Sequence, residues 1–114
     1  MTQEDKELLL KDLCARLPYK VVIKDRNGVH ILTIGNTEFT DLFNDKCNIA
    51  PYLFPMSSMT EEQKRDYQYI TERWMNDPTY TISDSFDWLN ENHFDYRGLI
   101  EKGLAIDATG LNIY

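Results

Sequence analysis

The sequence predicts an α+β fold, in which a small antiparallel meander of about three strands packs with N-terminal, central and C-terminal helices. Three observations support this class. Leucines recur at helical spacing near the start, an Asn-Gly pair separates two alternating apolar segments, and a second helical pattern follows a proline-containing connector. With 114 residues, of which 42% are hydrophobic, the chain can form one domain over residues 1–114 with its own core.

The first helix is expected to begin after Thr2 and to end near Leu17. The Thr2 side chain can accept a hydrogen bond from a free N–H of the first turn, and Pro18 disfavours continuation of the helix. The expected inner face consists of leucines at helical spacing: Leu9, Leu10, Leu13 and Leu17. The expected outer face carries charged residues: Lys6, Lys11 and Asp12.

A β-hairpin is expected after this helix. Asn27 and Gly28 lie between the alternating segments 19–24 and 29–34. Both central residues of a type I′ turn need positive φ, which Asn and Gly adopt most easily. The turn is therefore expected at these two residues.

The register of the hairpin follows from the loop length. A loop of two residues places Ile23 opposite Leu32, so that the apolar residues of both strands share one face. The same register sets His30 opposite Asp25, where we expect a surface pair without a catalytic or metal-binding role.

The segment 37–43 is open to two interpretations. Phe39 and Leu42 fit one face of a helix, whereas Gly35 and Asn36 fit a turn into a third strand. We favour the strand, because two strands alone are only marginally stable.

An extended connector is expected over residues 49–56, since Pro51 and Pro55 are incompatible with the interior of a helix. A second long helix follows, and Thr60 and Gln63 have the spacing of a capping box at its start.

The inner stripe of this second helix is expected to consist of Tyr67, Ile70 and Trp74. Residues 76–78 end the helix. Residues 79–82 are either a short strand at the sheet edge or an extended link.

The block 84–103 combines aromatic, acidic and capping residues more densely than any other part of the chain. Ser83 or Asp84 is expected to cap a short helix. One face of that helix would hold Phe86, Leu89 and His93.

A further short helix is expected from Asp95, which can cap it, to Gly103, where glycine suits the left-handed C′ position. Leu99 and Ile100 would face inward. The apolar tail 104–114 is expected to dock on the domain in part.

Twelve Lys and Arg against nineteen Asp and Glu give a net charge of −7. This balance disfavours direct binding to nucleic acid or to an anionic membrane surface, and we expect neither. The sequence shows no N-terminal apolar run typical of a signal peptide or a membrane span, so we expect a cytoplasmic protein.

No cofactor, structural disulfide or metal is expected. Cys14 is expected to be a small buried apolar group, and Cys47 lies far from it in the sequence. A metal site would require these cysteines to converge with His30 and His93 from separate elements, without the short ligand spacings of structural zinc. The five glycines form no phosphate-binding loop or dinucleotide fingerprint.

Three segments of the chain are similar in sequence to other proteins. They read MTQEDKELLLKDLCARLPY, PYLFPMSSMTEEQK and DWLNENHFDYRGLIEKGLAIDATGLNIY, and together they cover about half of the sequence. These segments resemble a group of small proteins from gut Bacteroides genomes, their prophages and their phages. The resemblance implies no activity, cofactor or site residue; it implies a bacterial cytoplasm and an accessory role in a mobile element.

The best enzyme-like combination is His93, Asp95 and Arg97, whose groups exchange protons or bind anions in other proteins. Residues two apart on a helix do not face each other, so this spacing is unfavourable for a catalytic pair.

We therefore expect a non-enzymatic accessory module that binds another protein. The expected contact residues are Trp88, His93, Tyr96 and Arg97. Two alternatives stay open: an acidic mimic of nucleic acid or inhibitor of a host protein, and a minor enzyme that uses the combination above. The partner and the oligomeric state are left open.

Overall fold

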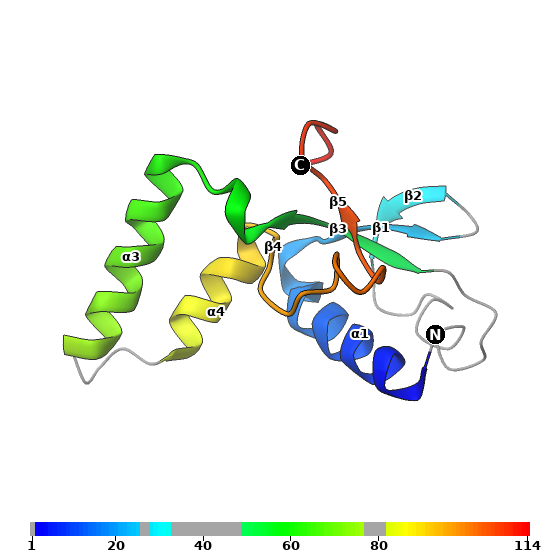
Figure 1. The fold of residues 1–114 in the computed structure, drawn as a ribbon, viewed down its shortest axis with the longest axis horizontal. Coiled ribbons are helices and arrows are strands. Elements are labelled where there is room, and N and C mark those ends of the chain that lie inside the picture. Colours follow the sequence, from blue (N-terminus) through cyan, green and yellow to red (C-terminus); the bar gives the residue numbers. More distant parts are fainter. Residues whose placement is uncertain (1, 26–27, 33–48, 77–81) are drawn as a thin grey trace.

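A mixed sheet and three α-helices make up the described part of this computed structural model, which covers residues 2–25, 28–32, 49–76 and 82–114. The helices are α1 (Gln3–Arg16), α3 (Glu61–Asn76) and α4 (Ile82–Glu91). The predicted α+β class is confirmed. Figure 1 shows α3 and α4 together at one end of a molecule that measures 46 × 30 × 24 Å. We call these two helices the arm, and α1 with the sheet the body.

The sheet has the order β2-β1-β3-β4, and β5 also pairs with β3. Its described strands are β1 (Val22–Asp25), β2 (Gly28–Ile31), β3 (Ala50–Pro55), β4 (Phe94–Asp95) and β5 (Ile106–Asp107). β1 is antiparallel to β2 and β3, whereas β4 and β5 are parallel to β3. The expected purely antiparallel meander is therefore wrong. The segment 37–43, expected as its third strand, lies outside the described residues.

The hairpin of β1 and β2 is present, but its register differs from the expected one by two residues. Ile23 is opposite His30 rather than Leu32, and Asp25 is opposite Gly28, so Gly28 begins β2 instead of lying in the expected turn. A shift by an even number keeps every side chain on its face. Ile23 and Leu32 accordingly remain together in the core, at 0% and 2% exposure. The apolar alternation therefore could not distinguish the two registers.

The central strand β3 is the segment that the sequence predicted only as an extended connector. Its antiparallel ladder with β1 includes Ile23 opposite Pro51, and Pro51 has no N–H to donate. The next pair would join Val22 to Tyr52. Instead, the Tyr114 hydroxyl accepts from the Val22 N–H at 2.9 Å and donates to the Tyr52 carbonyl at 2.7 Å. The tail thus docks as expected and bridges β1 and β3.

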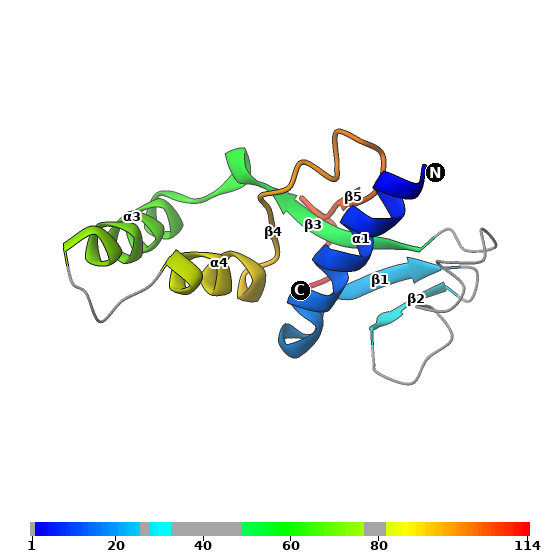
Figure 2. The ribbon, with the colours of Figure 1, turned by 90° about the horizontal axis from the view of Figure 1, so that it is seen from below.

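Helix α1 crosses one face of the sheet, as the view from below shows (Figure 2). Its start is as predicted, because the Thr2 hydroxyl accepts from the Asp5 N–H at 3.1 Å and the Asp5 carboxylate accepts from the Thr2 N–H at 3.3 Å. The expected division into faces is only partly correct. Leu9 and Leu13 are buried, but so are the charged residues at the same spacing: Lys6, Asp12 and Arg16. Cys14, expected in the core, is exposed.

The arm begins with the predicted capping box. The Gln63 N–H donates to the Thr60 hydroxyl at 3.1 Å, and the Thr60 N–H donates to the Gln63 amide oxygen at 2.9 Å. Of the expected inner stripe, Tyr67 and Ile70 are half-buried, and the side chain of Trp74 lies outside those described. The segment 79–81 is likewise outside the described residues.

Helix α4 departs from its predicted cap and face. It already includes Ile82, so Ser83 and Asp84 lie inside the helix rather than before it. Leu89 is buried, but Phe86 is 42% exposed. His93 lies beyond the helix in the left-handed region, with φ 63°, and therefore does not share a helical face with them.

The further helix expected over 95–103 is reduced to a single turn. The Asp95 carboxylate does cap it, accepting from the N–H groups of Leu99 and Ile100 at 2.9 Å each. Gly103 adopts φ 73°, its N–H donates to the Ile100 carbonyl, and the Leu104 N–H donates to the Leu99 carbonyl. This pair of bonds is a Schellman motif. The capping roles of Asp95 and Gly103 were predicted correctly, but the segment between them forms one turn instead of a helix.

Candidate functional site

A buried carboxylate joins α1 to the segment after α4. Asp12 Oδ2 accepts from Arg16 Nε at 2.8 Å, and Asp12 Oδ1 accepts from Arg97 Nη1 at 2.8 Å. The side chains of Asp12 and Arg16 are 0% exposed, and that of Arg97 is 16% exposed. One carboxylate therefore serves two guanidinium groups, and the three side chains together carry one surplus positive charge.

Arg16 reaches from the end of α1 to the backbone of β4. Its Nη2 donates to the Phe94 carbonyl at 2.6 Å. Its Nη1 is buried and has no hydrogen-bond partner among the described residues. Because burying a guanidinium is costly unless its charge is compensated, the pairing with Asp12 is essential to this arrangement.

The Tyr96 ring lies against both guanidinium groups. The Arg97 Cζ is 4.6 Å from its centroid and the Arg16 Cζ is 5.3 Å from it, both within the range of cation–π contacts. The Tyr96 hydroxyl donates to the Asn90 side-chain oxygen at 3.0 Å. The Phe86 ring packs on Tyr96 at 5.2 Å between centroids. The Tyr96 side chain is thus fixed in position by two guanidinium groups, one hydrogen bond and one ring contact.

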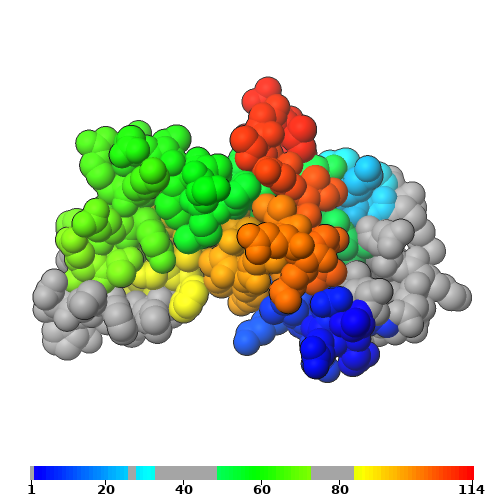
Figure 3. All heavy atoms as spheres, viewed as in Figure 1, coloured from blue at the N-terminus to red at the C-terminus, as the bar shows by residue number. Residues whose placement is uncertain are grey.

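These contacts border a surface pocket of about 430 Å³ between α1 and α4, which we call the Arg97 pocket. Its lining residues are Lys11, Ala15, Phe86, Asn90, Tyr96 and Arg97. The space-filling view shows a recess in the outline of the molecule between these two helices (Figure 3). The pocket combines two cations with two aromatic rings, one of which is substantially exposed.

His93 and Tyr114 form a second contact near Arg16. Their rings stack at 3.6 Å between centroids with an angle of 12°. Burial, and after it the Arg16 charge, lowers the pKa of His93 to about 4. Burial raises the pKa of Tyr114 to about 12, against the effect of its hydrogen bond from Val22. Both side chains are therefore neutral at physiological pH.

The structure separates the four residues expected to contact a partner. Trp88 is half-buried and stacks on Tyr67 and Phe94, at 5.7 Å in each case. His93 packs on Tyr114 as described. Only Tyr96 and Arg97 line the Arg97 pocket.

Sequence reasoning missed five residues around this pocket: Lys11, Asp12, Ala15, Phe86 and Asn90. One signal was available, because Asp12 and Arg16 are spaced i,i+4 on a face that also carries leucines. Asp12 and Arg97 are 85 residues apart, and no local pattern links them.

The combination of His93, Asp95 and Arg97 forms no hydrogen-bonded proton-transfer pair. Both Asp95 oxygens accept backbone N–H bonds, and Arg97 donates to Asp12. The His93 ring is stacked on Tyr114, and its Nδ1 is buried with no hydrogen-bond partner in the described part of the chain. Each of the three is therefore engaged by a different part of the fold.

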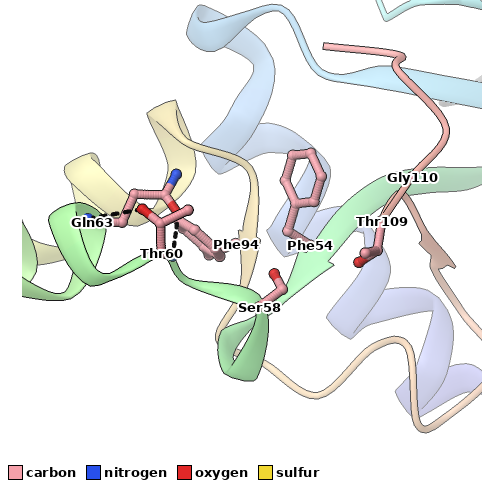
Figure 4. A pocket seen from close by; sticks show the side chains of 7 residues that line it. All are labelled: Phe54, Ser58, Thr60, Gln63, Phe94, Thr109 and Gly110. Atoms are coloured by element: carbon pink, nitrogen blue, oxygen red, sulfur yellow. Dashed lines mark hydrogen bonds between the residues drawn. The ribbon is translucent and has the colours of Figure 1, made fainter.

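Two other hollows have fewer groups suited to binding. One, of about 230 Å³, lies between Phe54 and Phe94 and has three hydroxyl groups around it, from Ser58, Thr60 and Thr109 (Figure 4). The hydroxyls of Ser58 and Thr60 are already used, in bonds to the Pro55 carbonyl and from the Gln63 N–H. The other hollow, of about 330 Å³, is bordered by the carboxylates of Asp95 and Glu101.

Within the described ranges, no three His, Cys, Asp or Glu side chains are grouped so that they could hold a metal ion. Cys47, one of the four residues considered for such a site, lies outside those ranges. None of the described helices has the length and apolar character needed to cross a membrane.

No protein-family model, curated protein or solved structure matches the chain.

Proposed function

We propose that this protein is a non-enzymatic binding module that contacts another protein through the Arg97 pocket. The observation that carries the proposal is the fixed position of Arg97 at the surface. A fully buried Asp12 carboxylate and the Tyr96 ring hold its guanidinium, beside the exposed Phe86 ring. Arg and Tyr dominate binding hot spots, and groups already held in place lose less entropy when a partner binds.

The alternative of an acidic nucleic-acid mimic would use the arm instead. Residues 61–91 contain eight acidic and three basic residues, which accounts for five of the seven net negative charges. Lys64 and Arg65 interrupt the acidic residues of α3, and Lys64 pairs with Glu61 at 3.4 Å. These cations break up the acidic residues in the described part of α3, and this alternative has less support than the pocket.

Site-specific photocrosslinking tests the proposal. A photoreactive phenylalanine analogue replaces Phe86 in one sample and Tyr69 in another, and both samples are exposed to a bacterial lysate. Tyr69 is a matched control because it is 58% exposed on α3, away from the pocket lining. We expect a discrete crosslinked protein with the probe at position 86 only.

The Lys11→Gln variant provides a second arm of this test. Lys11 is exposed and makes no side-chain hydrogen bond or ion pair with the described residues, so the change should leave the fold intact. It should reduce crosslinking from position 86. Equal crosslinking from both positions, or none from position 86, would contradict the proposal.

A further inference from the structure

We infer that the Arg97 pocket recognises a carboxylate next to an aromatic or large apolar side chain, that is, a short acidic segment of the partner protein. This inference rests on the proposed function and specifies the chemistry of the partner. It is carried by two features of the pocket: an uncompensated positive charge and an exposed aromatic wall.

The positive charge arises because Asp12 is shared. Its single negative charge is divided between Arg16 and Arg97, and Arg16 is fully buried, where water cannot screen it. The surplus charge therefore makes the electrostatic potential positive at Arg97, which is the partly exposed member of the group. Lys11 adds a second positive charge to the lining and pairs with no acidic residue in the described parts of the chain.

The guanidinium of Arg97 retains donors for a ligand. Asp12 takes one bond, from Nη1, and makes the only hydrogen bond to this side chain among the described residues. Its contact with the Tyr96 ring, 4.6 Å from the Cζ to the centroid, further restricts the position of the guanidinium. A fixed guanidinium with free N–H groups matches a carboxylate better than a mobile lysine does, because it can bind both oxygens at once.

The exposed Phe86 ring indicates that the ligand has an apolar group as well as an anionic one. Phe86 is 42% exposed although its ring already contacts Tyr96 at 5.2 Å. An apolar side chain of the partner would cover this ring while its neighbouring carboxylate reaches Arg97. The volume of about 430 Å³ falls in the range of ligand pockets, roughly 300–1,000 Å³.

The surroundings favour one carboxylate over a polyanion. Asp87 and Glu91 are exposed and adjoin Phe86 and Asn90 in the sequence of α4. Their charges, with the net charge of −7, would repel a nucleic-acid backbone that must pass along the surface. A short segment with one acidic residue is repelled less, because it carries a single negative charge that can be placed at Arg97.

A peptide titration followed by amide NMR shifts of the isotope-labelled full chain tests the inference. The probe is an acetylated and amidated Gly-Phe-Asp-Gly peptide, compared with Gly-Phe-Asn-Gly and Gly-Ala-Asp-Gly. We expect saturable shifts at Tyr96 and Arg97, and an affinity about tenfold or more lower for each comparison peptide. Raising the salt concentration should weaken binding of the aspartate peptide.

Variants that leave the ion pairs of Asp12 intact test whether the peptide binds in the Arg97 pocket. Lys11→Gln and Phe86→Ala should each weaken binding roughly three- to tenfold. Lys102→Gln and Tyr69→Ala, which change exposed residues outside the pocket, should leave it unchanged. Arg97→Ala is less suitable as a single test, because it would leave the buried Asp12 with one partner fewer.

Three results would overturn the inference. They are equal affinity for the aspartate and asparagine peptides, no shifts at Tyr96 and Arg97, and equally strong shifts with inorganic phosphate alone, which would indicate a site for any anion. Crosslinking from position 86 combined with any of these would leave the proposed function standing while refuting the acidic segment. Peptide binding without a crosslinked protein would support recognition of an acidic segment by the pocket, but would refute the proposed function as tested with the lysate.

Discussion

The body and the arm of this protein are held together by different kinds of side chain. The body buries an aliphatic cluster between α1 and the sheet: Leu9, Leu13, Val21, Ile23, Leu32, Ile49, Leu53, Leu99, Leu104 and Ala105. Among the side chains that the structure describes, the cluster beside the arm has Met59, Leu89 and Phe94 as its buried members, and half-buried rings such as those of Tyr67 and Trp88 pack against them.

This difference follows from the geometry of each region. In the body, a helix covers a sheet and small branched side chains fill the layer between them. None of the described strands runs beneath the two helices of the arm, and wide aromatic rings that stay partly in water cover the contact between them. The Asp12 group lies between the regions and ties α1 to the segment after α4. The stability of the protein should therefore depend differently on the body, on the arm and on this joint formed by the Asp12 group.

The largest effect is expected for Asp12→Ala, which leaves Arg16 buried without a counter-charge. Removing one partner from a buried ion pair typically costs about 3–5 kcal/mol of unfolding free energy. Chemical denaturation measures the loss. Glu7→Ala, at an exposed position on the same helix, should change stability by less than about 0.5 kcal/mol. Similar costs for the two variants would mean that the joint contributes little.

A pair of truncations compares the two regions directly. Leu13→Ala removes a side chain with 0% exposure from the body and should cost about 2–5 kcal/mol. Tyr67→Ala removes a half-buried ring from the arm and should cost about 1–2 kcal/mol. Hydrogen exchange should also show faster opening in α3 than in α1. Equal costs and equal exchange would remove the distinction between body and arm.

The Tyr114→Phe variant tests the bridge between β1 and β3. It keeps the ring stacked on His93 but removes the hydroxyl that serves the Val22 N–H and the Tyr52 carbonyl. Because these two bonds are only partly shielded from water, we expect their loss to cost about 1 kcal/mol of unfolding free energy. Thermal or chemical unfolding measures the change. The control is Tyr67→Phe, whose hydroxyl makes no hydrogen bond within the described ranges; a loss of the same size there would refute the bridge.

The smallest effect is a pH dependence from His93. Its pKa falls from 6.5 to about 4 on folding, so the folded state binds fewer protons than the unfolded state between these values. Stability is therefore unaffected by this group above pH 6.5 and declines as pH falls from 6.5 towards 4. Because the ring is only half-buried, we expect a decline on the order of 1–2 kcal/mol.

Comparison with His93→Phe isolates this contribution, because the variant keeps an aromatic ring and cannot titrate. The second histidine, His30, remains in both proteins with its contact to Asp25 and cancels in the difference. Denaturation at several pH values should show a shallower decline for the variant. Parallel profiles would show that His93 is not the group responsible.

Local chemistry in the sequence determined the ends of several elements. These ends depend on hydrogen bonds between residues at most five apart in the sequence, as at Thr2, at Thr60 with Gln63, and at the left-handed Gly103. Alternation in the hairpin likewise determined which side chains face the core. Such features are predictable because the interacting groups are neighbours in any conformation that forms the element.

The tertiary structure alone decided the hairpin register, the central place of β3, and the burial of Asp12 and Arg16. An even shift of register preserves both faces, and the proline-containing strand becomes central only when segments forty or more residues away pair with it. A charged residue is expected at the surface unless its partner is known, and Arg97 is 85 residues from Asp12. Contacts of that separation carry a loop-closure cost that only the packing of the whole chain offsets, so no local pattern reports them.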